Sequence, residues 1–95
     1  MKLSSITLWD KNPRKISPEN FEKLKQSLST DIEGLAENKI CLNKIGGELV
    51  VYCGNQRTKA LIDLGHEELP DDYFEVSEIP EKLMISRAMT NNEGY

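Results

Sequence analysis

The sequence predicts a small α+β domain in which a mixed sheet with a central hairpin is flanked by about three to four helices. Two observations support this prediction. Strand-like and helix-like segments alternate along the chain, and a Gly-Gly pair joins two of the strand-like segments. The 95 residues suffice for one hydrophobic core and leave no room for a second. Residues 1–95 are therefore expected to form a single domain.

The N-terminal third predicts a strand followed by a helix. Residues 3–9 are strand-like, and the polar segment 10–14, which contains an Asn-Pro pair, ends that strand. Ser17-Pro18-Glu19 begins a helix, because Ser caps the first turn, Pro fits the first helical position and Glu favours the positive end of the helix dipole. Residues 29–38 are compatible with a second short helix or with a loop around Gly34. The buried face of the first helix consists of Phe21, Leu24 and Leu28.

Residues 39–45 and 48–53 predict a hairpin, because Gly46-Gly47 supplies the positive φ angles that a two-residue turn requires. A regular register from that turn pairs Ile40 with Cys53 and puts Cys41 and Cys53 on opposite faces of the sheet. In that register Cys53 is a small buried residue on the core face, and a disulfide to Cys41 is disfavoured.

The second half of the chain predicts another helix, a short strand and a last helix. Residues 55–64 form the helix, and Gly65 closes it at a position that favours a left-handed backbone. Residues 69–76 include the strand, and residues 80–90 form a helix with apolar residues on one side.

The composition does not indicate a membrane or secreted protein. The first residues lack the apolar block of a signal peptide, and the longest apolar run, residues 49–53, is far too short to span a bilayer. Two cysteines without CxxC spacing and a single histidine do not predict a metal site. The expected location is the cytoplasm, with no membrane partner and no structural metal.

Charge is distributed unevenly along the chain. Residues 1–62 hold ten Lys or Arg against seven Asp or Glu, a net charge of +3, whereas residues 63–95 hold two against nine, a net charge of −7. The acidic C-terminal third would repel a nucleic-acid backbone. Direct DNA binding by this domain alone is therefore expected to be weak.

The most informative segment is the turn that follows the second hairpin strand. Gly54 allows close backbone approach, the first N–H groups of the following helix have no partner within the helix, and Arg57 adds a fork-shaped donor. This architecture suits a phosphate group. The alternative is an ordinary strand-to-helix turn in which Arg57 makes a surface ion pair.

Short motifs, in order along nearly the whole chain, resemble the ParB N-terminal/sulfiredoxin superfamily. The turn and helix Gly54–Ala60 resemble its G-x-x-R-x-x-A signature, which continues with Leu64-Gly65 and Leu69-Pro70. Asn12-Pro13-Arg14 resembles the N-P-R that precedes the first helix in that family. Asn91–Tyr95 resembles the segment that ends the phage and methylase-associated branch, and it looks cut short, as expected if residues 1–95 are the N-terminal part of a longer protein.

This resemblance implies nucleotide binding, because ParB-type domains bind CTP and sulfiredoxins bind ATP, with the Gly-x-x-Arg turn at the phosphates. A nucleoside triphosphate, CTP or ATP with Mg²⁺, is thus the expected ligand. Arg14 would close the site from the other side. The candidates carried over by position are Gly54, Asn55, Gln56, Arg57 and Thr58, with Lys59 as a secondary one.

Sulfiredoxin activity does not follow from the resemblance. The catalytic cysteine of sulfiredoxins lies two residues before the Arg, where this chain has Asn55. Cys53 lies four residues before Arg57, and a thiol displaced in this way is expected to lack the placement that lowers its pKa.

We therefore expect a nucleotide-binding module that serves phage, plasmid or other DNA handling. One alternative is a non-catalytic DNA-docking or protein-interaction domain, with Lys11, Arg14 and Lys15 as DNA contacts. A further alternative is an enzyme: a nucleotide hydrolase, a small-molecule kinase or a nuclease. A homodimer is compatible with each. A kinase or nuclease needs carboxylates for Mg²⁺, and no pair stands out by spacing among Glu48, Asp63, Glu67 and Glu68.

Overall fold

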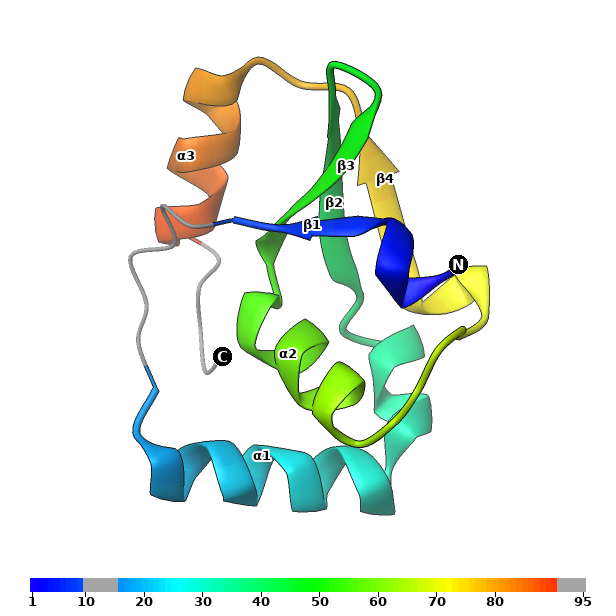
Figure 1. Ribbon diagram of the computed structural model, residues 1–95. Coiled ribbons are helices and arrows are strands. Elements are labelled where there is room, and N and C mark those ends of the chain that lie inside the picture. The colour runs from blue at the N-terminus through cyan, green and yellow to red at the C-terminus, as the bar shows by residue number, and fades with distance from the viewer. Residues whose placement is uncertain (10–15, 91–95) are drawn as a thin grey trace.

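The computed structural model describes residues 1–9 and 16–90, whose helices and strands are shown in Figure 1. The strands are β1 (Ile6–Leu8), β2 (Ile40–Ile45), β3 (Glu48–Cys53) and β4 (Phe74–Ser77). The α-helices are α1 (Pro18–Thr30), α2 (Asn55–Asp63) and α3 (Glu81–Thr90). Short 3₁₀ helices lie at Leu3–Ser5, Ile32–Ala36 and Asp71–Tyr73.

The strands form one mixed sheet in the order β1-β3-β2-β4. The central pair β2 and β3 is the antiparallel hairpin, whereas β1 pairs with β3 and β4 pairs with β2 in parallel. The predicted α+β class and the central hairpin are therefore confirmed.

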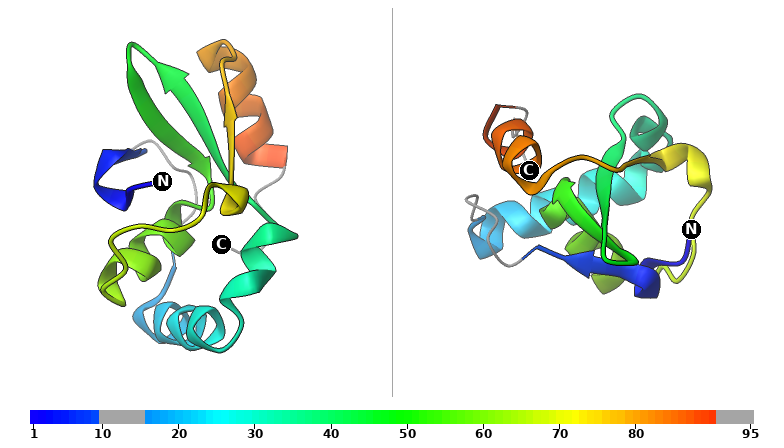
Figure 2. Two further views of the ribbon diagram at one scale, coloured as in Figure 1. Left: turned by 90° about the vertical axis from the view of Figure 1, so that its right-hand side faces the viewer. Right: turned by 90° about the horizontal axis from the view of Figure 1, so that it is seen from above.

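Helices cover both faces of this sheet (Figures 1 and 2). The larger core lies between α1, α2 and one face, where Leu28, Leu42 and Leu61 belong to a single buried cluster. The smaller core lies between α3 and the opposite face, where Met84 packs with Tyr52 and Val50. No helix in the described part of the chain is long and apolar enough to cross a membrane.

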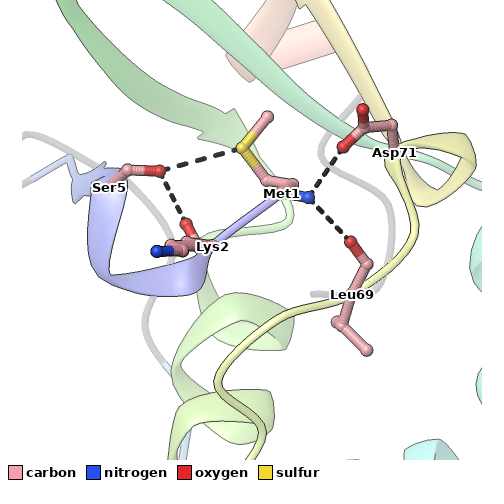
Figure 3. A network of polar contacts seen from close by, with 5 residues as sticks. All are labelled: Met1, Lys2, Ser5, Leu69 and Asp71. Atoms are coloured by element: carbon pink, nitrogen blue, oxygen red, sulfur yellow. Dashed lines mark hydrogen bonds and ion pairs between the residues drawn. The ribbon is translucent and has the colours of Figure 1, made fainter.

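The N-terminal segment differs from the predicted strand, because Leu3–Ser5 forms a 3₁₀ turn before β1 begins. The Ser5 hydroxyl donates to the Lys2 carbonyl at 2.7 Å, and this local bond favours a turn over an extended chain. Figure 3 shows how the Met1 ammonium attaches this segment to the chain after α2, with the Leu69 carbonyl at 2.9 Å and Oδ1 of Asp71, at the start of the third 3₁₀ helix, at 2.7 Å. The predicted break at residues 10–14 lies outside the described residues.

The helix ends follow the sequence signals. Ser17 accepts a hydrogen bond from the Asn20 N–H and caps α1, as predicted. Gly65, with φ of +93°, ends α2, and the N–H groups of Gly65 and His66 donate to the carbonyls of Ile62 and Leu61. The ambiguous segment 29–38 holds the end of α1 and the 3₁₀ helix Ile32–Ala36.

The hairpin register corrects the prediction for the two cysteines. Pairing is regular from Ile45 opposite Glu48 to Leu42 opposite Val51, and then shifts so that Cys41 lies opposite Cys53. This β-bulge leaves one extra residue, Tyr52, on β3. Both cysteines pack against the α3 side of the sheet, so the predictions that they lie on opposite faces and that Cys53 faces the main core are wrong.

Candidate functional site

The turn between β3 and α2 begins the helix at a glycine with a left-handed backbone. Gly54 has a φ of +95° and is the N-cap of α2, and no side chain caps this end of the helix. The first bond within the helix joins the Thr58 N–H to the Gly54 carbonyl at 2.9 Å. The N–H groups of residues 55–57 precede that bond, as in any helix start, and they carry the positive end of the α2 dipole.

The Arg57 side chain folds back over Gly54 toward the start of β2. Its guanidinium donates to the carbonyls of Asn38 and Lys39, the latter at 3.4 Å. Burial lowers the pKa of Arg57, while the neighbouring thiols of Cys53 and Cys41 raise it. Arg57 thus links α2 to β2 through backbone carbonyls, which differs from the surface ion pair of the alternative interpretation.

The polar residues of the turn are buried. Asn55 is 4% exposed, and its Oδ1 accepts a hydrogen bond from the Trp9 N–H at 3.3 Å. Gln56 is 7% exposed. Thr58 is fully buried, and both its hydroxyl and its N–H donate to the Gly54 carbonyl at 2.9 Å. Thr58 therefore uses its two donors inside α2 in this conformation, whereas Lys59 is exposed.

The thiol of Cys53 lies beside Arg57. A hydrogen bond from Cys41 and the charge of Arg57 lower the pKa of Cys53 to about 6, against an opposing effect of burial. The hydrogen bond with Cys53 and burial raise the pKa of Cys41. The expectation that Cys53 lacks a placement which lowers its pKa is therefore wrong, because the bulge brings Cys41 next to it.

The other predicted residues do not converge on the turn. Lys11, Arg14 and Lys15 lie outside the described residues. Asp63 pairs with Lys25 of α1 at 2.6 Å. Among residues 1–9 and 16–90, no group of three or more His, Cys, Asp or Glu side chains is placed to hold a metal ion.

Three contacts of this turn were not predicted from the sequence: Cys41 with Cys53, Arg57 with the Asn38 and Lys39 carbonyls, and Asn55 with the Trp9 N–H. The first depends on the bulge, which no turn residue in β2 or β3 signals. The others join segments far apart in the chain, so local patterns carry no information on them.

These elements form a ParB-like domain fold. The C-terminally truncated chromosome-partitioning protein ParB from Caulobacter crescentus, complexed with CTP-gamma-S, matches with a TM-score of 0.74 and 17% identity, over 96% of this chain and 49% of that chain. The same protein complexed to the centromeric parS site matches with a TM-score of 0.71 and 19% identity, over 96% and 44%. This chain thus spans less than half the length of these structures, and at such identity the likeness concerns the fold. No family model and no curated protein sequence matches the chain.

Proposed function

We propose that this chain is a ParB-like nucleotide-binding module in which the turn from Gly54 to Arg57 receives the phosphates of CTP or ATP. The observation that carries the proposal is the start of α2, where a glycine with φ of +95° precedes uncapped helical N–H groups and an arginine lies one turn further. The ParB structure that holds CTP-gamma-S supports it, because the two chains share their fold. Phage, plasmid or other DNA handling is the process that such a module would serve.

Phosphate binding at this turn requires a change at Arg57. In the structure its guanidinium donates to two neutral backbone carbonyls. Hydrogen bonds between charged partners are roughly twice as strong as neutral ones, so a phosphate at the α2 N-terminus would compete with these carbonyls for the guanidinium. We expect Arg57 to turn toward the phosphate, with Mg²⁺ accompanying the nucleotide and Arg14 as a further phosphate contact.

Calorimetric titration with CTP, ATP and GTP, with and without Mg²⁺, tests the proposal. Arg57→Ala should weaken nucleotide binding by about 1.5 to 3 kcal/mol, roughly ten- to hundredfold, because a charge-assisted hydrogen bond is lost. Lys44→Ala is the matched control, since it removes a positive charge from an exposed position near the hairpin turn at the other end of β2. If no nucleotide binds at millimolar concentration, or if both variants lose the same affinity, the proposal fails.

A DNA-docking domain is the second candidate. A solved ParB structure with this fold is complexed to the centromeric parS site, and the N-terminal two thirds of this chain carries a net charge of +3. Lys11, Arg14 and Lys15 would then contact DNA phosphates. Tight duplex binding at near-physiological salt without nucleotide binding would favour this candidate.

A further inference from the structure

The two cysteines lie side by side on the central hairpin. The bulge places Cys41 of β2 directly opposite Cys53 of β3, and their thiols are within hydrogen-bonding reach of each other. Opposed residues of an antiparallel pair have Cα atoms about 4.5 to 5.5 Å apart, which falls within the roughly 4.4 to 6.8 Å that disulfides span. Both residues are thiols in this structure and both are partly exposed.

The surroundings of the two thiols differ in charge. Cys53 lies beside the Arg57 guanidinium, which stabilises a thiolate. Cys41 Sγ also lies 3.7 Å from the Lys39 carbonyl oxygen and 4.0 Å from the Glu75 carboxylate, and either can accept its single S–H in place of Cys53, so that Cys41 is held as a thiol. Cys53 is therefore suited to attack a disulfide. Cys41 is placed to attack the mixed disulfide that this reaction would leave on Cys53.

We propose that Cys41 and Cys53 form a redox-active dithiol site that exchanges with low-molecular-weight disulfides. In the first step the Cys53 thiolate attacks one sulfur of the small disulfide, a mixed disulfide forms on Cys53, and a small thiolate leaves. In the second step Cys41 loses its proton to that thiolate and attacks Cys53 Sγ, which closes the Cys41–Cys53 disulfide and releases a second small thiolate. The protein thiol–thiolate pair is oxidised by two electrons, and one small disulfide is reduced to one small thiol and one small thiolate.

Arg57 is a positioning residue in this site. It is held by the Asn38 and Lys39 carbonyls, and it faces Cys53 from the first turn of α2. Its role in thiol chemistry does not depend on a nucleotide, so the dithiol proposal stands separately from the proposed function.

Incubation of the full chain with oxidised glutathione at pH 7, followed by mass spectrometry, tests the proposal. Wild type should lose two hydrogens and retain no glutathione, because the mixed disulfide is resolved within the molecule. Cys41→Ser should accumulate one glutathione on Cys53, and Cys53→Ser should react severalfold more slowly at Cys41. A wild type that stays reduced, keeps its glutathione adduct or forms only intermolecular dimers would overturn the proposal.

Alkylation measures the preference between the two thiols directly. Substoichiometric iodoacetamide should modify Cys53 of reduced wild type at least about tenfold more than Cys41. In Cys41→Ser the pH dependence of the alkylation rate should give a pKa for Cys53 well below the usual value of about 8.5. Adding Arg57→Ala to that variant should raise the pKa of Cys53. A rate profile for Cys53 with its midpoint at the usual pKa, or preferential alkylation of Cys41, would contradict the proposal. Circular dichroism of each variant establishes that it is folded.

Discussion

At the scale of single residues, Gly54 meets two structural requirements. Its φ of +95° lies in a region that side chains with a Cβ disfavour. A Cβ at this position would lie 2.8 Å from Arg57 Nη2 and 3.1 Å from Ile40 Cγ1. The sequence indicated a glycine for close approach of a ligand, and the structure adds that the packing of Arg57 over the turn requires one.

Gly54→Ala is expected to lower the free energy of unfolding by about 2 to 3 kcal/mol, because the left-handed backbone costs about 1 to 2 kcal/mol and Arg57 must leave its carbonyl partners. Gly65→Ala is the matched control, since its φ is +93° but nothing lies within 4 Å of its added Cβ. That variant should lose about 1 to 2 kcal/mol in urea unfolding. Equal losses would mean that the contact with Arg57 contributes nothing.

The thiol pair makes stability depend on pH. The pKa of Cys53 is lowered to about 6 in the folded state, so its contribution is fully present above the unfolded pKa of about 8.5 and is lost as the pH falls toward 6. The pKa of Cys41 is raised, so its contribution is fully present below the unfolded pKa of about 8.5 and is lost as the pH rises beyond that value. Urea unfolding of the reduced protein should therefore show stability rising between pH 6 and about 8.5.

The Cys53→Ser variant tests this effect, because it removes the Cys53 thiol and leaves the residues that do not contact it unchanged. The difference in unfolding free energy between wild type and Cys53→Ser should grow from pH 6 to about 8.5. A difference that is constant over this range would show that Cys53 has an ordinary pKa in the folded protein.

At the scale of elements, the sequence predicted what depends on local chemistry and missed what depends on strand pairing. Ser17 and Gly65 set the ends of α1 and α2 through bonds within their own turns, so their residue types are sufficient signals. The Gly46-Gly47 turn fixed the hairpin and its register as far as Leu42. The bulge beyond Leu42 shifts the pairing by one residue, and a regular alternation therefore placed Cys53 on the wrong side of the sheet.

Asn43 is a second feature that sequence patterns did not reveal. It is fully buried on β2, its Nδ2 donates to the Ile79 carbonyl at 3.0 Å, and its Oδ1 accepts from the Ile79 N–H at 2.9 Å. The amide thus continues the sheet's hydrogen bonding to the segment that leads into α3. This pair holds α3 over the sheet together with the buried side chain of Met84.

Asn43→Ala is expected to destabilise the protein by about 2 to 3 kcal/mol, because both polar groups of Ile79 lose their partner in a partly buried site. Lys44→Ala, at the neighbouring exposed position, should change stability by less than about 1 kcal/mol. Thermal and urea unfolding measure both. Should the two variants prove equally stable, the Asn43–Ile79 pair would not be what attaches α3.

At the scale of the whole molecule, the charge distribution bears on which of the proposed partners this domain can bind. The ParB-like fold occurs in a protein complexed with CTP-gamma-S and with parS, whereas this chain carries a net charge of −4 with its acidic residues concentrated after residue 62. A small nucleotide at the proposed site would contact one turn and would be little affected by distant charge. A duplex presents one negative charge per about 1.7 Å and would meet the acidic third of the chain over its length.

Direct DNA binding should therefore be weak and strongly dependent on salt. Nucleotide binding should be tighter and should depend less on salt. The double variant Lys11→Ala/Lys15→Ala should lower duplex affinity further and reduce the salt slope by about two, as expected when two phosphate contacts are lost. Its nucleotide affinity should be unchanged, and Lys23→Ala/Lys44→Ala provides a control of equal charge.

Fluorescence anisotropy with duplex DNA at several salt concentrations, alongside the calorimetric titrations, separates DNA binding from nucleotide binding. Tight duplex binding that both double variants retain would show that neither lysine pair forms the DNA contact and that the charge argument is wrong.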